Sequence, residues 1–113
     1  MPHQAIDFEV VRAIGAALPD VSDASGRRGM ALKVKGRLLA CKAIHRSAEP
    51  DSLMVRISLQ RREALLAQDA DAYYVTDHYV PYPAILVRLS RIERKPLKEL
   101  LTEAWEFVRM EVQ

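Results

Sequence analysis

Cysteine is almost absent from this sequence of 113 residues, and Cys41 has no second thiol with which to form an internal disulfide or a zinc-binding cluster. Long apolar runs are absent as well, because none approaches the roughly 18 residues that a membrane-spanning helix requires. The first residues contain no basic segment followed by an apolar run, so no secretory signal peptide is predicted. These absences favour a reducing compartment, and we expect a cytoplasmic protein that makes no contact with a membrane.

Signatures of enzyme chemistry are also missing. The sequence contains no G-x-S-x-G or comparable nucleophile motif, and His3, His45 and His78 do not have the spacing of metal ligands. Cys41 falls inside a predicted strand, which gives its thiol no reason to be activated. We therefore expect no catalytic residue, no metal and no cofactor. A small-molecule or catalytic site around Asp77 and His78 stays open as an alternative. Such a site would need a concave pocket there.

The composition is that of one globular domain. Half of the residues are apolar and 28% are charged, and the net charge of +2 corresponds to a pI near 8.9. A chain of this length can bury roughly two-thirds of its unfolded surface, which suffices for a core without disulfides. We predict a single domain over residues 1–113. The small net charge does not by itself indicate nucleic acid, so the distribution of the charges matters more.

Hydrophobic periodicity predicts three helices and five strands. Asp7 is a suitable N-cap for a helix over 8–18 that Pro19 ends, 59–68 has helical composition, and Pro96 suits the first turn of the last helix. Alternating or β-branched segments predict strands within 30–36, 37–44, 52–58, 72–77 and 84–90, and a short edge segment within 21–29. The order α-β-β-β-α-β-β-α indicates an α+β fold, an antiparallel sheet with helices on one face.

The charged residues of the predicted strands are basic, apart from Asp77 at the end of one of them. The candidates for DNA contact are Lys33, Lys35, Arg37, Lys42, Arg56 and Arg88. Arg27 and Arg28 in the preceding loop extend this set. If the helices cover one face of the sheet, the other face is basic and suits a phosphate backbone, with weak and salt-dependent binding. The alternative is an ordinary solvated sheet face whose lysines prevent edge-to-edge aggregation.

The segment Val75–Pro83, VTDHYVPYP, is the densest in chemical groups. Its candidate site residues are Thr76, Asp77, His78, Tyr79 and Tyr82. One hypothesis is structural: a side chain of Thr76 or Asp77 fixes a turn, and the tyrosines cover the end of the sheet. Another is a contact surface for a partner protein, with the tyrosines as rigid anchors. On that reading the protein is a protein-interaction or chaperone-like module, and we expect a monomer or a weak homodimer.

Several segments resemble the MmcQ/YjbR family of small bacterial proteins. They are Met54–Ser58, "REALLAQDADAYYVTDHY", "YPAILVRLSRI" and "LKELLTEAWEFV", and the opening residues are similar too, so that the resemblance covers most of the chain. It implies an α-β(3)-α-β(2)-α fold similar to that of type III secretion chaperones. It also implies the DNA-binding label that family members usually carry, with a proposed double-wing contact, and no enzymatic activity or cofactor. Val80, Pro81 and Ala84 depart from the family's pattern and imply a stiffer loop with one aromatic fewer.

Overall fold

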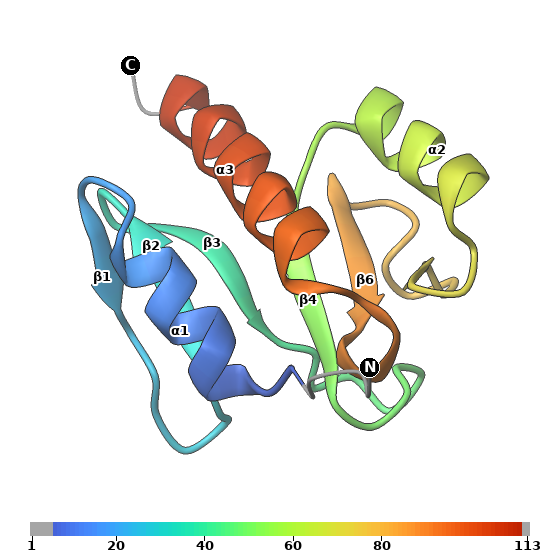
Figure 1. Ribbon diagram of the computed structural model, residues 1–113, viewed down its shortest axis with the longest axis horizontal. Helices are drawn as coiled ribbons and strands as arrows, with labels where there is room; N and C mark the ends of the chain where they lie inside the picture. Colours follow the sequence, from blue (N-terminus) through green and yellow to red (C-terminus); the bar gives the residue numbers. More distant parts are fainter. Residues whose placement is uncertain (1–5, 112–113) are drawn as a thin grey trace.

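The computed structural model describes residues 6–111, which form one six-stranded antiparallel sheet and three helices (Figure 1). The helices are α1 (Phe8–Ala16), α2 (Leu59–Gln68) and α3 (Arg94–Glu111), and a short 3-10 helix spans Leu89–Arg91. The strands are β1 (Val21–Asp23), β2 (Ala31–Val34), β3 (Arg37–Lys42), β4 (Ser52–Arg56), β5 (Tyr73–Tyr74) and β6 (Ala84–Arg88). They lie in the order β1-β2-β3-β4-β6-β5. The predicted α+β class is confirmed, and the expected edge segment forms β1, a fourth strand before α2.

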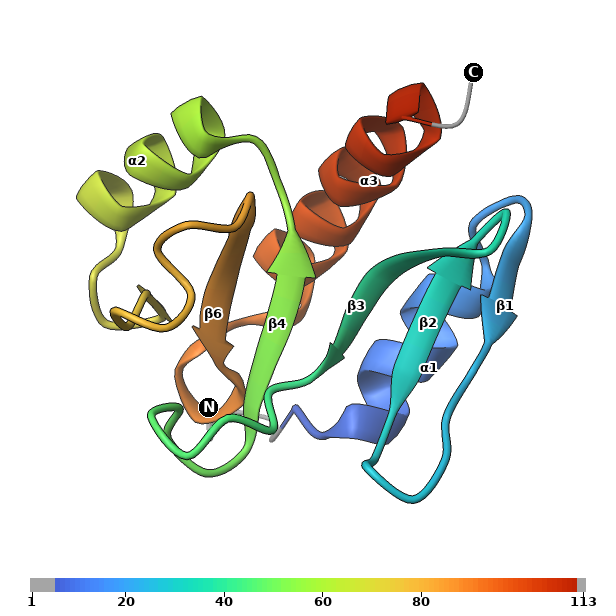
Figure 2. The ribbon, with the colours of Figure 1, turned by 180° about the vertical axis from the view of Figure 1, so that it is seen from behind.

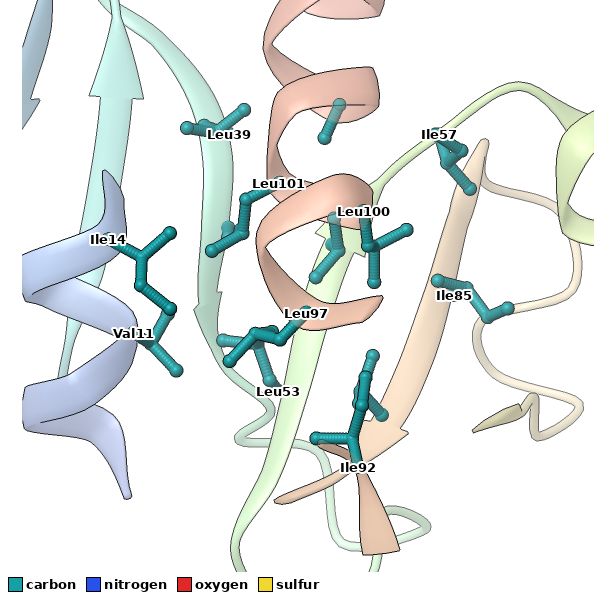
Figure 3. Packing of buried hydrophobic residues seen from close by; sticks show 14 of the residues in the cluster. Val11, Ile14, Leu39, Leu53, Ile57, Ile85, Ile92, Leu97, Leu100 and Leu101 are labelled. Carbon is teal, nitrogen blue, oxygen red and sulfur yellow. The ribbon is translucent and has the colours of Figure 1, made fainter. Parts of the chain in front are cut away.

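The helices α1 and α3 cover one face of the sheet, which we call the helix face (Figure 1). The opposite face of β2, β3 and β4 has no helix over it, and we call it the open face (Figure 2). The core of the helix face is built from the apolar stripe of α3, which points Leu97, Leu100 and Leu101 toward the strands (Figure 3). The predicted member Trp105 lies at the margin of this stripe, where its Nε1 donates a hydrogen bond to the carbonyl oxygen of Pro19 at 2.8 Å.

The predicted N-cap Asp7 begins α1, and Ser58, which the sequence pattern placed in a strand, caps α2. The side chain of Asp7 accepts a hydrogen bond from the backbone N–H of Val10 at 3.0 Å, and that of Ser58 accepts one from Arg61 at 3.1 Å. Each bond satisfies a backbone donor that has no partner inside its helix. Helix α1 ends at Ala16, two residues before the predicted end at Leu18, and its last turn leads directly into the strand at the sheet edge.

The hairpin between β2 and β3 is closed by two residues with positive φ, Lys35 at 50° and Gly36 at 82°. This backbone matches the twist of antiparallel strands, so the two-residue turn expected from the sequence is correct. A register shift beside Lys33 then leaves Leu39 as an extra residue in β3, and Leu39 and Ala40 both face the helix-face core. Because of this bulge, every later residue of β3 points opposite to the simple alternation.

The central strands are buried on both faces, which the sequence pattern did not predict. On the open face, Met54 of β4 and Leu86 of β6 form a second apolar cluster with Ala84 and Tyr79, and each is at most 9% exposed. The loop between β5 and β6 supplies Tyr79 and covers this part of the sheet. The prediction of a fully solvated second face was therefore wrong for β4 and β6, and the open surface is confined to β2, β3 and the margin of β4.

Candidate functional site

The six basic residues predicted to share a sheet face are distributed over three environments. Lys33 points to the open face, where it pairs with Leu38 across the strands, and Lys35 and Arg37 are exposed at the tip of the hairpin. Lys42 lies beyond the bulge and faces the helix side, with its Nζ 5.9 Å from the centroid of the Phe8 ring. The extra residue in β3 therefore turns Lys42 away from the face of Lys33, although Lys42 still borders the same depression beside the β1–β2 loop.

Arg56 is on the open face but is engaged by the protein itself. Its Nη2 donates to Oε2 of Glu111 at 2.7 Å, and its Nε donates to the carbonyl oxygen of Pro83 at 3.4 Å. The guanidinium also lies 5.7 Å from the centroid of the Phe107 ring. Because Glu111 already neutralises this guanidinium, Arg56 is a weaker candidate for DNA contact than an unpaired cation.

Arg88 is held still more completely. Its Nε and Nη2 donate to the carboxylate of Glu49 at 2.8–3.1 Å, and its Nη1 donates to the carbonyl oxygens of Ala70 and Asp71. The plane of the guanidinium lies 4.2 Å from the centroid of the Tyr74 ring. The hydrogen bonds to Arg88 lower the pKa of Glu49, which keeps the pair charged. Arg88 therefore acts as a clamp between three segments of the chain.

Arg27 and Arg28, unlike Arg56 and Arg88, are available to bind an anionic ligand. They are exposed in a tight loop, in which Gly26 and Gly29 exchange backbone hydrogen bonds of 3.1 and 3.0 Å. Gly29 has a φ of 110°, which only glycine adopts readily, and a Cβ there would meet the side chain of Lys42 at 2.8 Å. Within residues 6–111, Arg27, Arg28 and Lys33 form no ion pair.

Three adjoining depressions of about 500, 400 and 400 Å³ run across the open face from this loop to the β5–β6 loop. They share lining residues and form one continuous surface, which we call the open-face trough. Its floor consists of Leu38, Cys41, Met54 and Ala84. One end is lined by Arg27, Arg28 and Lys33, and the other by His45, His78, Tyr79 and Tyr82. Among the described residues that line the trough there is no aspartate or glutamate.

The segment Val75–Pro83 is fixed mainly by main-chain atoms. The carbonyl oxygen of Thr76 accepts hydrogen bonds from the N–H groups of Tyr79 and Val80, at 2.8 and 3.0 Å. The side chain of Thr76 instead contacts Oγ of Ser47 at 2.8 Å, which joins the loop to the β3–β4 connection. The sequence predicted a turn fixed by a side chain of Thr76 or Asp77. The turn exists, but a backbone carbonyl closes it and Asp77 is exposed.

The two loops also meet through a stack of imidazole rings. The rings of His45 and His78 are nearly parallel, with centroids 3.5 Å apart and an angle of 6° between their planes. Tyr79 packs edge-on against both rings, and Nδ1 of His45 accepts a hydrogen bond from the N–H of Ser47 at 3.1 Å. Desolvation lowers the pKa of His45, and the nearby charges of His78 and Arg46 lower it further. The stack therefore favours a neutral His45.

Acidification is expected to loosen this stack. Because the pKa of His45 is lowered in the folded protein, the unfolded chain binds its proton first, and the contribution of the stack is complete above about pH 6.5. It is lost as the pH falls through the lower folded value. Proton titration by NMR should give a pKa for His45 below its ordinary value and a return toward that value in His78→Ala. Equal values in the two proteins would contradict the stacking.

Metal and enzyme chemistry gain no support from this region. Within the part of the chain that the structure describes, no three His, Cys, Asp or Glu side chains lie close enough to hold a metal ion. His3 lies outside the described residues. Burial raises the pKa of the Cys41 thiol, so that it is less reactive than a free cysteine. A depression does border His78 and Tyr79, but Asp77 is not among its lining residues.

Comparison with known proteins places the fold. No family model matches the sequence. The crystal structure of Deinococcus radiodurans protein DR2400, a DUF419 domain, superposes with a TM-score of 0.75 over 95% of this chain and 81% of that one, at 19% sequence identity. The fold is that of a DUF419 domain. DUF419 is the MmcQ/YjbR-type family, so the architecture implied by the sequence resemblance is confirmed, whereas an identity of this size carries no conclusion about function.

Sequence comparison finds relatives that cover only part of the chain. Uncharacterized proteins of Mycobacterium bovis and Mycobacterium tuberculosis are 46% identical over 56 residues, which are 49% of this chain and 43% of theirs. The match thus spans less than half of the mycobacterial proteins. Among residues 6–111, no helix is long and apolar enough to cross a membrane.

Proposed function

We propose that this protein is a non-enzymatic, DNA-binding module that uses the open-face trough. The observation that carries the proposal is the charge of the lining: unpaired cations gather at one end, and among the described residues no aspartate or glutamate lines the surface, although Glu111 pairs with the lining residue Arg56. A polyanion is the class of ligand that such a lining attracts, because each neutralised phosphate releases condensed counterions. The sequence resemblance to the MmcQ/YjbR family implies the same DNA-binding function. We expect it to act in the cytoplasm, as a monomer or a weak homodimer.

The principal contacts are Arg27, Arg28 and Lys33, and Lys35 and Arg37 at the hairpin tip extend the basic surface. These five side chains are partly or fully exposed and form no ion pair within the described residues. They neutralise phosphates and do not read bases, so binding is weak and has little sequence preference. The arginines of β4 and β6 stabilise the fold instead, because their donors are already used by carboxylates and carbonyl oxygens.

The test is fluorescence anisotropy with labelled DNA, at low and at near-physiological salt. We expect micromolar binding that weakens steeply as salt rises. The variant Arg27→Glu/Arg28→Glu/Lys33→Glu should lose binding. Its matched control makes the same change in net charge on α3, where Arg94, Lys95 and Lys98 are exposed on the helix side.

Two results would contradict the proposal. If the α3 control loses binding as completely as the trough variant, the interaction depends on net charge and not on this surface. If the unaltered protein fails to bind DNA even at low salt, where electrostatic attraction is screened least, it is not a DNA-binding module.

A second candidate function is protein interaction through the rim of the trough. Tyr82 and Val80 of the β5–β6 loop are 54% and 45% exposed, and Ile44, which follows β3, is 55% exposed. Exposed aromatic and aliphatic side chains on a stiff loop are typical anchors of interfaces. This function predicts a partner that is retained in high salt and lost in Tyr82→Ala. A strictly monomeric protein that retains no partner would count against it.

A further inference from the structure

The apolar floor of the open-face trough is better suited to single-stranded than to double-stranded nucleic acid. Leu38, Cys41, Met54 and Ala84 line it, and none of their side chains carries a strong hydrogen-bond donor or acceptor. Leu38 and Cys41 are its half-buried part, whereas Met54 and Ala84 are at most 7% exposed beside Tyr79. A duplex turns its phosphates outward and keeps the faces of its bases stacked inside, so it would leave this floor uncovered. A single strand exposes flat, largely apolar base faces that can cover it.

The two ends of the trough match the two parts of a nucleotide. Arg27, Arg28 and Lys33 offer point charges to phosphates at the β1–β2 end. At the other end the rings of His78 and Tyr82 lie with centroids 6.1 Å apart, and the tyrosine ring is largely free. Tyr82 thus presents a ring beside the floor.

The size of the trough also suits a short stretch of one strand. From Lys33 on β2 to Ala84 at the start of β6 it spans three strand spacings, or roughly 14 Å, and it passes beside the part of β4 and β6 that Tyr79 covers. Helices α1 and α3 lie on the opposite face of the sheet and do not obstruct an extended chain on this one (Figure 2). Phosphates can therefore reach the cations while neighbouring bases lie on the floor and against the rings.

We propose that the ligand of the open-face trough is single-stranded nucleic acid. Its bases lie on the floor beside Leu38 and Met54 and against the ring of Tyr82, and its phosphates lie at Arg27, Arg28 and Lys33. This inference rests on the proposed function and specifies the form of its ligand. An acidic peptide with apolar side chains would satisfy the same charges. The single strand is the better match, because the exposed faces of Tyr82 and His78 can stack with bases whatever the sequence.

The experiment compares labelled oligothymidylate with a duplex of the same length, under the salt conditions of the anisotropy measurement. We expect the single strand to bind at least tenfold more tightly than the duplex. Tyr82→Ala should weaken binding of the single strand by about tenfold and leave the duplex unchanged, while Tyr82→Phe should bind like the unaltered protein. The side chain of Tyr82 is exposed, and the residue contacts Arg62 through its backbone carbonyl oxygen, which both variants keep. These variants should therefore fold normally.

Met110→Ala is the matched control, because Met110 is 73% exposed near the end of α3 and away from the trough. Three outcomes would overturn the inference. Equal or tighter binding of the duplex, with no effect of Tyr82→Ala, rejects the single strand and leaves the proposed function standing. Absence of binding to both DNA forms rejects both. Displacement of oligothymidylate by an acidic, apolar peptide at lower concentration than by unlabelled single strand identifies a protein ligand instead.

Discussion

Replacement of Arg62 by methionine is expected to lower the free energy of unfolding by about 3 kcal/mol. The guanidinium is 6% exposed and donates to the carbonyl oxygens of Tyr82, Ala84 and Val80 at 2.9–3.2 Å. Methionine has a similar length and helix propensity but donates no hydrogen bond. The three acceptors are backbone carbonyl oxygens, so they remain when the side chain of Arg62 is changed. In the variant they would have no hydrogen-bond donor, in a place that water reaches poorly.

Chemical denaturation measures this effect, and the neighbouring arginine is its control. Arg61 forms a part-exposed ion pair with Glu103, so Arg61→Ala should cost less than about 1 kcal/mol. Hydrogen exchange adds a local readout: in Arg62→Met the amides of Tyr79 and Val80 should exchange faster than those of β2. A variant as stable as the unaltered protein would show that water replaces the guanidinium without loss.

Tyr79→Ala is the second large effect, and we expect it to cost about 3 kcal/mol. The ring is 9% exposed and packs against Met54 and Leu86, which have no helix to cover them on that face. Removing it opens a cavity over the centre of the sheet. The hydroxyl contributes little, because it lies 3.4 Å from the N–H of His45, which is long for a hydrogen bond.

The phenylalanine variant separates the two contributions. Tyr79→Phe should stay within about 1 kcal/mol of the unaltered protein, whereas Tyr79→Ala should unfold at clearly lower urea. If both variants lose the same stability, the hydroxyl and not the packing of the ring holds the loop. Leu59→Ala, at a half-exposed position in the first turn of α2, controls for the loss of an apolar side chain outside the core.

Local signals in the sequence were sufficient for most of the fold. Asp7 marks the start of α1 through its side-chain oxygen, and the stripe of α3 marks its buried face through its period. Lys35 and Gly36 mark the hairpin because few residue pairs accept two positive φ values. Each of these features depends on residues a few positions apart, which is why the sequence alone predicts them.

The candidate site depends on features that are not local. The bulge at Leu39 has no glycine or proline to mark it, and it sends Lys42 to the helix side. The partners of the two strand arginines are far along the chain: Glu111 lies 55 residues from Arg56, and Glu49 lies 39 residues from Arg88. Sequence reasoning recognised the basic residues correctly but had no signal for which of them are already neutralised.

Contacts between residues far apart in the sequence also explain why part of the open face is buried and not solvated as predicted. Met54 and Leu86 alternate with Val55 and Ile85, so the pattern reads as an ordinary strand with one face inward. Only the folded loop shows that Tyr79 covers them. A single sequence does not distinguish a strand buried on both faces from a half-buried strand that carries a few apolar residues on its outer face.

The position of α3 has a consequence for synthesis on the ribosome. The strands β2, β3 and β4 are complete at Arg56, but the helix that covers their apolar face ends at Glu111, 55 residues later. At about 5–20 residues per second, a ribosome needs roughly 3–11 s to make this interval. During that time the nascent sheet presents its core face to solvent, and we expect it to depend on early chaperone contact until the Arg56–Glu111 pair can close.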